Sequence, residues 1–108
     1  MKGPTITEWL RCNQLSEKDI SFIEAFLTFS SMVRQSTVGE DKVNDTLHSQ
    51  FSHYQADIKK SITLDQFKSI LINNSIDIDA EQLLIRYKNQ GICKDFCKYL
   101  LRQKDLYK

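Results

Sequence analysis

The chain has 108 residues, a length that predicts a single domain. Hydrophobic residues make up 41% of it, enough for one small core, and three glycines and one proline are too few for the frequent turns of an all-β sandwich or barrel. The formal net charge of +1 gives no overall field that would select nucleic acid or a membrane surface. We therefore expect a mostly helical, soluble domain.

The cysteines and the apolar segments predict a cellular location. Cys12, Cys93 and Cys97 do not have the spacing of a disulfide framework, which indicates free thiols in a reducing compartment. No apolar run approaches the roughly 20 residues of a membrane span, and the N-terminus, MKGPTITEW, lacks the apolar centre of a signal peptide. We expect a cytoplasmic protein with no membrane partner.

The first third of the chain predicts two helices. Residues Thr5 to Asn13 favour a short opening helix with Trp9 turned inward. Ser16 is typical of an N-cap, and it precedes the acidic first turn of a second helix. The apolar residues of that helix, between positions 20 and 33, cover more than one face, so we expect it to be central in the fold.

A break over residues 35–41 follows, and Gly39 is the expected turn residue. His48 and His53 share no helical face and have no nearby nucleophile, so we expect surface histidines. A thinner amphipathic helix is predicted here from apolar residues at helical spacing: Val43, Leu47, Phe51 and Tyr54.

The second half predicts three further helices. Thr63 and Gln66 have the spacing of a capping box at the start of the first. The linker 73–79 ends it, and Asp79 is the expected cap of the next. The sequence Asn-Gln-Gly at 89–91 breaks that helix. The last one carries an inner face of Phe96, Tyr99 and Leu100.

From Leu47 to Leu101 the pattern resembles a pair of EF-hands. Ile62 stands where that family has the apolar residue of its loop, and Phe67 directly follows the last loop position. The stretch from Gly91 to Phe96, which includes Ile92, is similar to the second half of another loop. The resemblance implies two helix–loop–helix units, with Ile62 and Ile92 side by side in a short β-bridge.

The residues at the metal-binding positions depart from the family. Gln55, Asp57 and Lys59 would stand at the first, third and fifth loop positions, and Gln66 where a bidentate glutamate is needed. The second loop is too short for a metal loop. One carboxylate beside lysines cannot offset the dehydration of a divalent cation. We therefore expect no calcium, no other metal and no cofactor.

Motifs of catalysis are missing as well. The chain has no glycine-rich phosphate loop, no nucleophile elbow and no paired-histidine motif. The acidic pairs at 40–41 and 77/79 are explained by turns and helix caps. We expect no catalytic residue, so the protein is not expected to be an enzyme.

Together these elements predict an all-α fold, a small helical domain of five to six helices. The single domain spans 1–108, with an N-terminal helical half at 14–46, the EF-hand-like pair at 47–101 and a basic tail at 102–108. A generic helical bundle and a winged-helix-like domain are the alternatives.

The first functional hypothesis is a calcium-independent, regulatory interaction module. EF-hand proteins that have lost calcium act as light-chain-like or adaptor subunits that bind an amphipathic helix in an apolar groove, and the resemblance implies the same here. The alternative for the groove residues is burial in the domain's own core. The expected partner-binding residues are Phe22, Phe26, Phe29, Met32, Phe67 and Leu71.

The second hypothesis is a small nucleic-acid-binding or regulatory domain of the phage or viral type. Lys94, Lys98 and Arg102 recur at every fourth position of the last helix and would form a ridge that contacts a phosphate backbone. The alternative is an ordinary solvated face, because the ridge lies opposite the apolar face of that helix.

Overall fold

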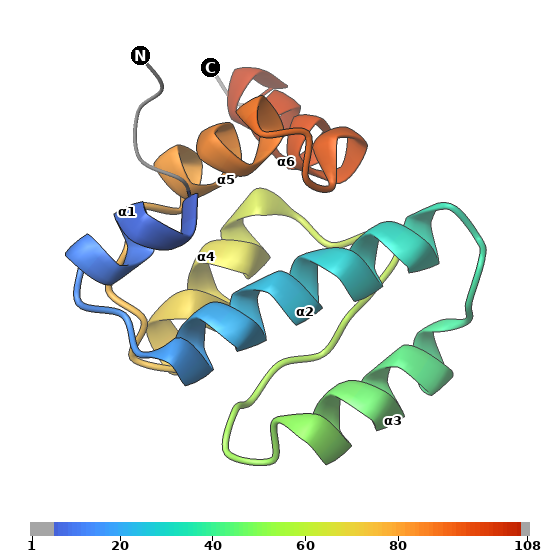
Figure 1. Cartoon of the computed structure of the whole chain (residues 1–108). Helices are drawn as coiled ribbons and strands as arrows, with labels where there is room; N and C mark the ends of the chain where they lie inside the picture. The colour runs from blue at the N-terminus through green and yellow to red at the C-terminus, as the bar shows by residue number, and fades with distance from the viewer. Residues whose placement is uncertain (1–5, 107–108) are drawn as a thin grey trace.

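The structure, a computed structural model, describes residues 6–106, with side chains up to residue 103. These residues form helices and no strand, so the predicted all-α class is confirmed (Figure 1). Thr5, the predicted start of the first helix, lies outside the described residues. The helices are α1 (Ile6–Cys12), α2 (Glu17–Arg34), α3 (Glu40–Gln50), α4 (Leu64–Asn73), α5 (Ala80–Asn89) and α6 (Lys94–Leu106).

Local hydrogen bonds begin three helices at the predicted residues. The Ser16 side chain accepts a backbone N–H in the first turn of α2, and Asp79 does the same for α5. At α4 the Thr63 hydroxyl accepts the Gln66 N–H, while the Gln66 side chain accepts the Thr63 N–H at 2.9 Å. These caps need only neighbouring residues, which is why the sequence pattern identifies them.

The turn between α2 and α3 differs from the prediction. Ser36, not Gly39, adopts the left-handed conformation, with φ of 61°. Gly39 has φ of −75° and ψ of 156°, and it is the N-cap of α3. An extended N-cap needs no positive φ, so Gly39 is not the turn residue.

The helix predicted to include Tyr54 ends before it. α3 stops at Gln50, and Phe51 is its C-cap. Tyr54 lies in the following turn, where its ring stacks on Phe22 with centroids 4.3 Å apart and its hydroxyl donates to Asp19. Stacking on Phe22 thus packs the Tyr54 ring against the core, although Tyr54 itself lies outside any helix.

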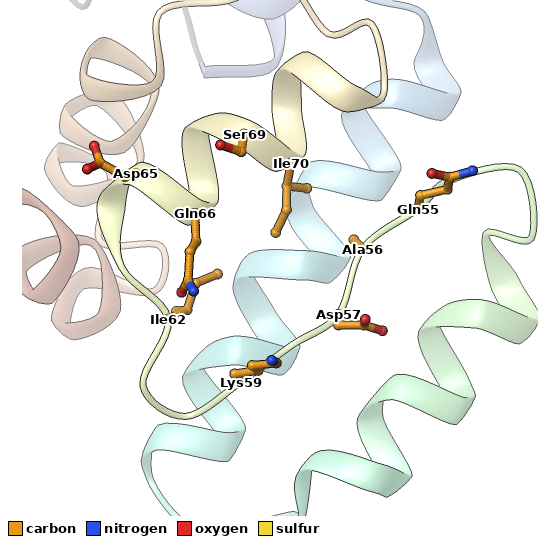
Figure 2. Close-up of a pocket in the computed structure, with 9 residues that line it drawn as sticks. All are labelled: Gln55, Ala56, Asp57, Lys59, Ile62, Asp65, Gln66, Ser69 and Ile70. Carbon is orange, nitrogen blue, oxygen red and sulfur yellow. The ribbon is translucent and has the colours of Figure 1, made fainter.

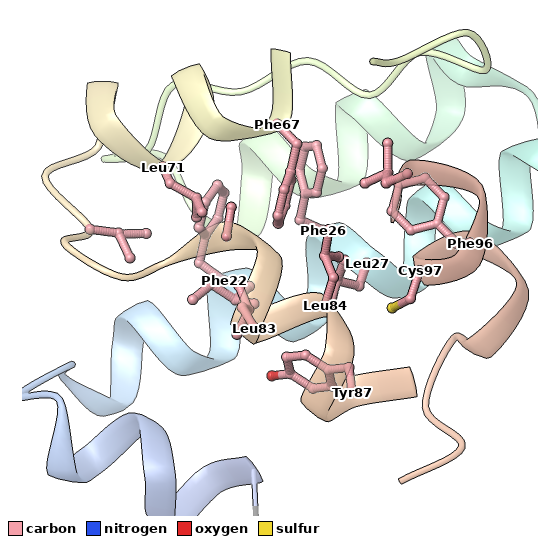
Figure 3. Packing of buried hydrophobic residues seen from close by; sticks show 14 of the residues in the cluster. Phe22, Phe26, Leu27, Phe67, Leu71, Leu83, Leu84, Tyr87, Phe96 and Cys97 are labelled. Atoms are coloured by element: carbon pink, nitrogen blue, oxygen red, sulfur yellow. The ribbon is translucent and has the colours of Figure 1, made fainter. Parts of the chain in front are cut away.

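Helix α2 is central, as its wide apolar stripe predicts. It packs against α1, α3 and α6, and α3 packs against no other described helix. The buried side chains form one cluster, in which Phe26 of α2 meets Phe67 of α4 with ring centroids 5.8 Å apart (Figure 3). At one end of this core Trp9 is half-buried and Arg86 lies over its ring.

The β-bridge expected between Ile62 and Ile92 is not formed. Ile62 is buried, and its carbonyl accepts the Tyr99 hydroxyl at 2.8 Å. Ile92 is 37% exposed, and its N–H donates to the Tyr87 carbonyl at 3.0 Å in the turn after α5. The Ile62 carbonyl and the Ile92 N–H are therefore each bonded to a helix residue, and among the described residues no hydrogen bond joins the two loops.

The C-terminal boundary also differs from the predicted one. The residues set apart as a basic tail, 102–108, begin inside α6, because this helix continues to Leu106. Tyr107 and Lys108 lie outside the described residues. The predicted break between α5 and α6 is confirmed, with Gln90 as C-cap and Gly91 at a φ of +75°.

Candidate binding groove

Residues 55–60, which we call the strand-like segment, run between α3 and α4, and the chain is extended over 55–59 before a turn begins at Lys60 (Figures 1 and 2). Their side chains alternate in burial: Ile58 is fully buried, whereas Asp57 and Lys59 on either side of it are exposed. This period of two is that of a strand with one face on a core. The segment has no neighbouring strand among the described residues.

Two asparagines bind the main chain of this segment, each by two hydrogen bonds. Asn44 of α3 accepts the Ile58 N–H at 2.6 Å and donates to the Ile58 carbonyl at 3.0 Å. Asn74, the C-cap of α4, accepts the Gln55 N–H at 2.7 Å and donates to the Gln55 carbonyl at 2.8 Å. Each amide thus satisfies both main-chain groups of one residue, as a paired strand would do.

Three more side chains bind the same edge of the segment as Asn44. His48 of α3 donates to the Ala56 carbonyl at 2.8 Å. Glu40 accepts the Lys60 N–H at 2.6 Å, and Arg34 donates to the Lys60 carbonyl at 3.0 Å. Of the main-chain groups of residues 56, 58 and 60 on this edge, only the Ala56 N–H has no partner among the described residues.

The opposite edge of the segment is mostly unpaired. In an extended chain the main-chain groups of alternate residues point to opposite sides. The groups of residues 55, 57 and 59 therefore point toward α4, where Asn74 bonds Gln55. The Asp57 N–H, the Asp57 carbonyl and the Lys59 N–H have no partner in the described part of the chain. We call these three groups the open edge.

A cavity of about 440 Å³ separates the open edge from α4. The strand-like segment forms one wall, and Gln66, Ser69 and Ile70 of α4 form the other (Figure 2). In Figure 2 the Gln66 and Ile70 side chains point from α4 into the gap. Ala56, Ile62 and Ile70 give the cavity an apolar part, and it also has charged residues at its rim. This volume falls in the usual range of ligand sites, and we call the cavity the 55–70 groove.

Most of the predicted partner-binding residues belong to the core. Phe22, Phe26 and Phe67 are each 1% exposed and Leu71 is 2% exposed, so in this structure they present no surface to a partner. They fill the centre of the domain because α2 has helices on several sides. Phe29 and Met32 are partly buried on α2. None of the six lines the 55–70 groove.

The positions compared with an EF-hand metal loop do meet around this groove. Gln55, Asp57, Lys59 and Gln66 all line it. Gln66, however, is bonded to Thr63 in the capping box, and Asp57 lies 3.2 Å from His48. Among the described residues no group of three or more His, Cys, Asp or Glu side chains could hold a metal ion.

The basic ridge lies on α6, and none of its three residues lines the groove. Lys94 and Arg102 are exposed and Lys98 is partly buried. None of the three forms an ion pair with another residue whose side chain the structure describes. The ridge is thus a cationic surface, because no acidic side chain that the structure describes forms an ion pair with it.

Two thiols lie near the start of α6, and Cys93 is partly buried there. Cys97 is fully buried, and burial raises the pKa of its thiol to about 12. Burial also raises the pKa of the Cys93 thiol, which the Thr28 hydroxyl lowers in part. A protonated, buried thiol is a poor nucleophile, which argues against a reactive role for Cys97.

The 55–70 groove was not foreseen from the sequence, although a signal for it is present. Ala56 and Ile58 alternate with the polar residues Gln55, Asp57 and Lys59, which is the pattern of a half-buried strand. The comparison with a metal loop led to a different interpretation of these residues.

Comparisons with known proteins give no family for this chain: no family model matches it, and no curated protein or solved structure does either. No helix in residues 6–106 is long and apolar enough to cross a membrane.

Proposed function

We propose that the protein is a non-enzymatic interaction module that binds a short segment of a partner protein, without calcium, in the 55–70 groove. The observation that supports this most is the groove itself: an open cavity of about 440 Å³ with apolar floor residues beside three unpaired main-chain groups. Peptide-binding sites combine main-chain hydrogen bonds with pockets for side chains in this way.

The adaptor role inferred from the EF-hand resemblance is retained in this proposal, but its binding surface changes. A partner helix against Phe22, Phe26 and Phe67 would have to displace core contacts, because these rings are buried. Binding in the 55–70 groove needs no such opening. The free-energy cost of exposing these buried rings to water is therefore avoided.

A library of random linear dodecapeptides displayed on phage tests the proposal. Selection on the wild-type protein, followed by synthesis of an enriched peptide, supplies the probe. Ser69 is an exposed residue of α4 that lines the groove, so Ser69→Trp should fill it and weaken binding at least roughly tenfold.

The matched control is Ser21→Trp, the same change at an exposed position of α2 that does not line this groove. It should leave the affinity unchanged, and calcium or a chelator should have no effect on any of the proteins. A selection that enriches no peptide sensitive to Ser69→Trp would reject the proposed function.

Nucleic-acid binding by α6 is the second candidate function. It is favoured by one observation, the exposed cations of the ridge that have no acidic partner among the described side chains. Three such charges would supply a modest, strongly salt-dependent affinity for a phosphate backbone.

A further inference from the structure

We propose that the partner segment binds in the 55–70 groove as an extended strand, paired through its main chain with Asp57 and Lys59. This inference rests on the proposed function and specifies the conformation of the bound segment. In this arrangement the protein supplies one isolated strand edge, and the partner supplies the strand beside it.

The open edge has the spacing that a strand requires. The Asp57 N–H and carbonyl can exchange both hydrogen bonds with one residue of a partner strand, and the Lys59 N–H lies two residues farther along the same edge. An extended peptide repeats its own donors and acceptors at this interval of roughly 6.6 Å, two residues of strand. The three groups therefore match a main chain rather than a scattered set of ligand atoms.

The ends of the open edge limit the length of the paired strand. At one end Asn74 already bonds both main-chain groups of Gln55. At the other end the Lys59 carbonyl accepts the Ile62 N–H at 3.2 Å in the turn that leads to α4. Three bonds remain, which corresponds to a partner strand of about four or five residues.

The walls of the groove specify the side chains of that strand. Apolar side chains line the core side of the groove at Ala56 and Ile62, with Ile70 beside them on the α4 wall. Toward solvent, the exposed Asp57 and Lys59 side chains flank the opening. Since side chains of a strand alternate between its two faces, we expect an apolar residue toward Ile70 with polar residues on either side of it.

A helical partner fits this edge less well than a strand does. The main-chain groups of a helix are already bonded within the helix, so a helix laid in the groove would cover the open edge without pairing it. Each covered and unpaired group would lower the affinity by roughly fivefold or more. A strand instead satisfies all three groups.

Proline substitutions inside and outside the groove test the mode of binding with the selected dodecapeptide as probe. Lys59→Pro removes a donor of the open edge, and we expect about three- to tenfold weaker binding than for Lys59→Ala, which keeps the donor. Ser52→Pro is the control, because Ser52 is exposed, does not line the groove and is the second residue of the turn that the Tyr54 N–H closes on the Phe51 carbonyl. It should bind the probe like wild type.

Amide hydrogen exchange on the wild-type protein gives a second measurement that does not depend on any variant folding. Saturation with the probe should slow exchange of the Asp57 and Lys59 amides at least roughly tenfold, and leave the Ala56 amide unchanged. A probe that is sensitive to Ser69→Trp, yet protects neither amide and tolerates Lys59→Pro, would overturn the strand mode. The interaction role would then stand, with a helix or another conformation as the bound form.

Discussion

The Asn44 side chain closes a ring of two hydrogen bonds on the main chain of Ile58, with its oxygen 2.6 Å from the N–H nitrogen and its nitrogen 3.0 Å from the carbonyl oxygen. No other bond joins α3 to the fully buried Ile58 residue. One side chain of α3 thus fixes the residue that anchors the strand-like segment in the core.

Replacing Asn44 with alanine should lower the free energy of unfolding by about 2–3 kcal/mol, because two bonds are lost and both Ile58 groups become unsatisfied in a partly buried place. Urea denaturation measures the change. Asp45→Ala, at the next and exposed residue of α3, should cost less than about 0.5 kcal/mol. Equal losses for the two variants would contradict the structural role of the ring.

A pair of alanine substitutions separates the core from the surface of α2. Phe26 is 1% exposed and packs on Phe67, so Phe26→Ala should cost about 3–5 kcal/mol of unfolding free energy. Met32 is only partly buried, and Met32→Ala should cost clearly less, about 1 kcal/mol. A folded Phe26→Ala protein with near wild-type stability would instead place this ring in a partner groove.

Stability should fall at alkaline pH. Burial raises the pKa of Cys97 from 9.0 to about 12, and burial together with the bond to Asp19 raises the pKa of Tyr54 from 10.0 to about 12. Both groups stay protonated in the folded protein after they have ionised in the unfolded chain. The contribution of these two groups to the free energy of unfolding is therefore fully present below about pH 9 and is lost between pH 9 and 12.

Thermal melting from pH 7 to pH 11 measures this decrease. In the Cys93→Ala, Cys97→Ala double variant, which removes both thiols whose pKa is raised, the decline should begin nearer pH 10, the ordinary value of tyrosine. If the melting temperature instead increases as the pH is raised beyond 9, the Cys97 thiol and the Tyr54 hydroxyl are not shielded from solvent.

The nucleic-acid alternative makes its own prediction. If the ridge binds a phosphate backbone, the logarithm of the association constant for single-stranded DNA should fall with the logarithm of salt concentration. Changing Lys94, Lys98 and Arg102 to alanine should reduce that slope by about 2, at about 0.7 per charge. Changing Lys18 and Lys42, which are exposed on α2 and α3, provides the control. Absence of DNA binding by the wild-type protein at low salt would remove this alternative.

Features that depend on neighbouring residues could be predicted from the sequence. The caps at Ser16 and Asp79 and the box of Thr63 with Gln66 involve residues three apart, so a short pattern contains all the atoms concerned. The central position of α2 followed in the same way from the width of its apolar stripe.

Features that depend on distant residues could not be predicted. Asn44 and Asn74 lie 14 and 19 residues from the main chain that they bind, and nothing in an asparagine's local sequence identifies such a role. The groove exists only in the folded protein, where these two asparagines hold the strand-like segment between α3 and α4. The predicted β-bridge between Ile62 and Ile92 was wrong for a related reason. A loop pattern does not specify which distant residues form hydrogen bonds with the main chain of the loop.

The absence of a neighbouring strand beside residues 55–60 has an evolutionary consequence. Within a sheet, lateral bonds join main chain to main chain, so most substitutions leave them intact. Here each bond that reaches the segment from α2, α3 or the end of α4 comes from a side chain. The position of the segment therefore depends on the identity of a few side chains. A single substitution at Asn44 or Asn74 can remove the hydrogen bonds that hold the segment at that point. Drift at these positions should be slower than at the exposed helical positions around them.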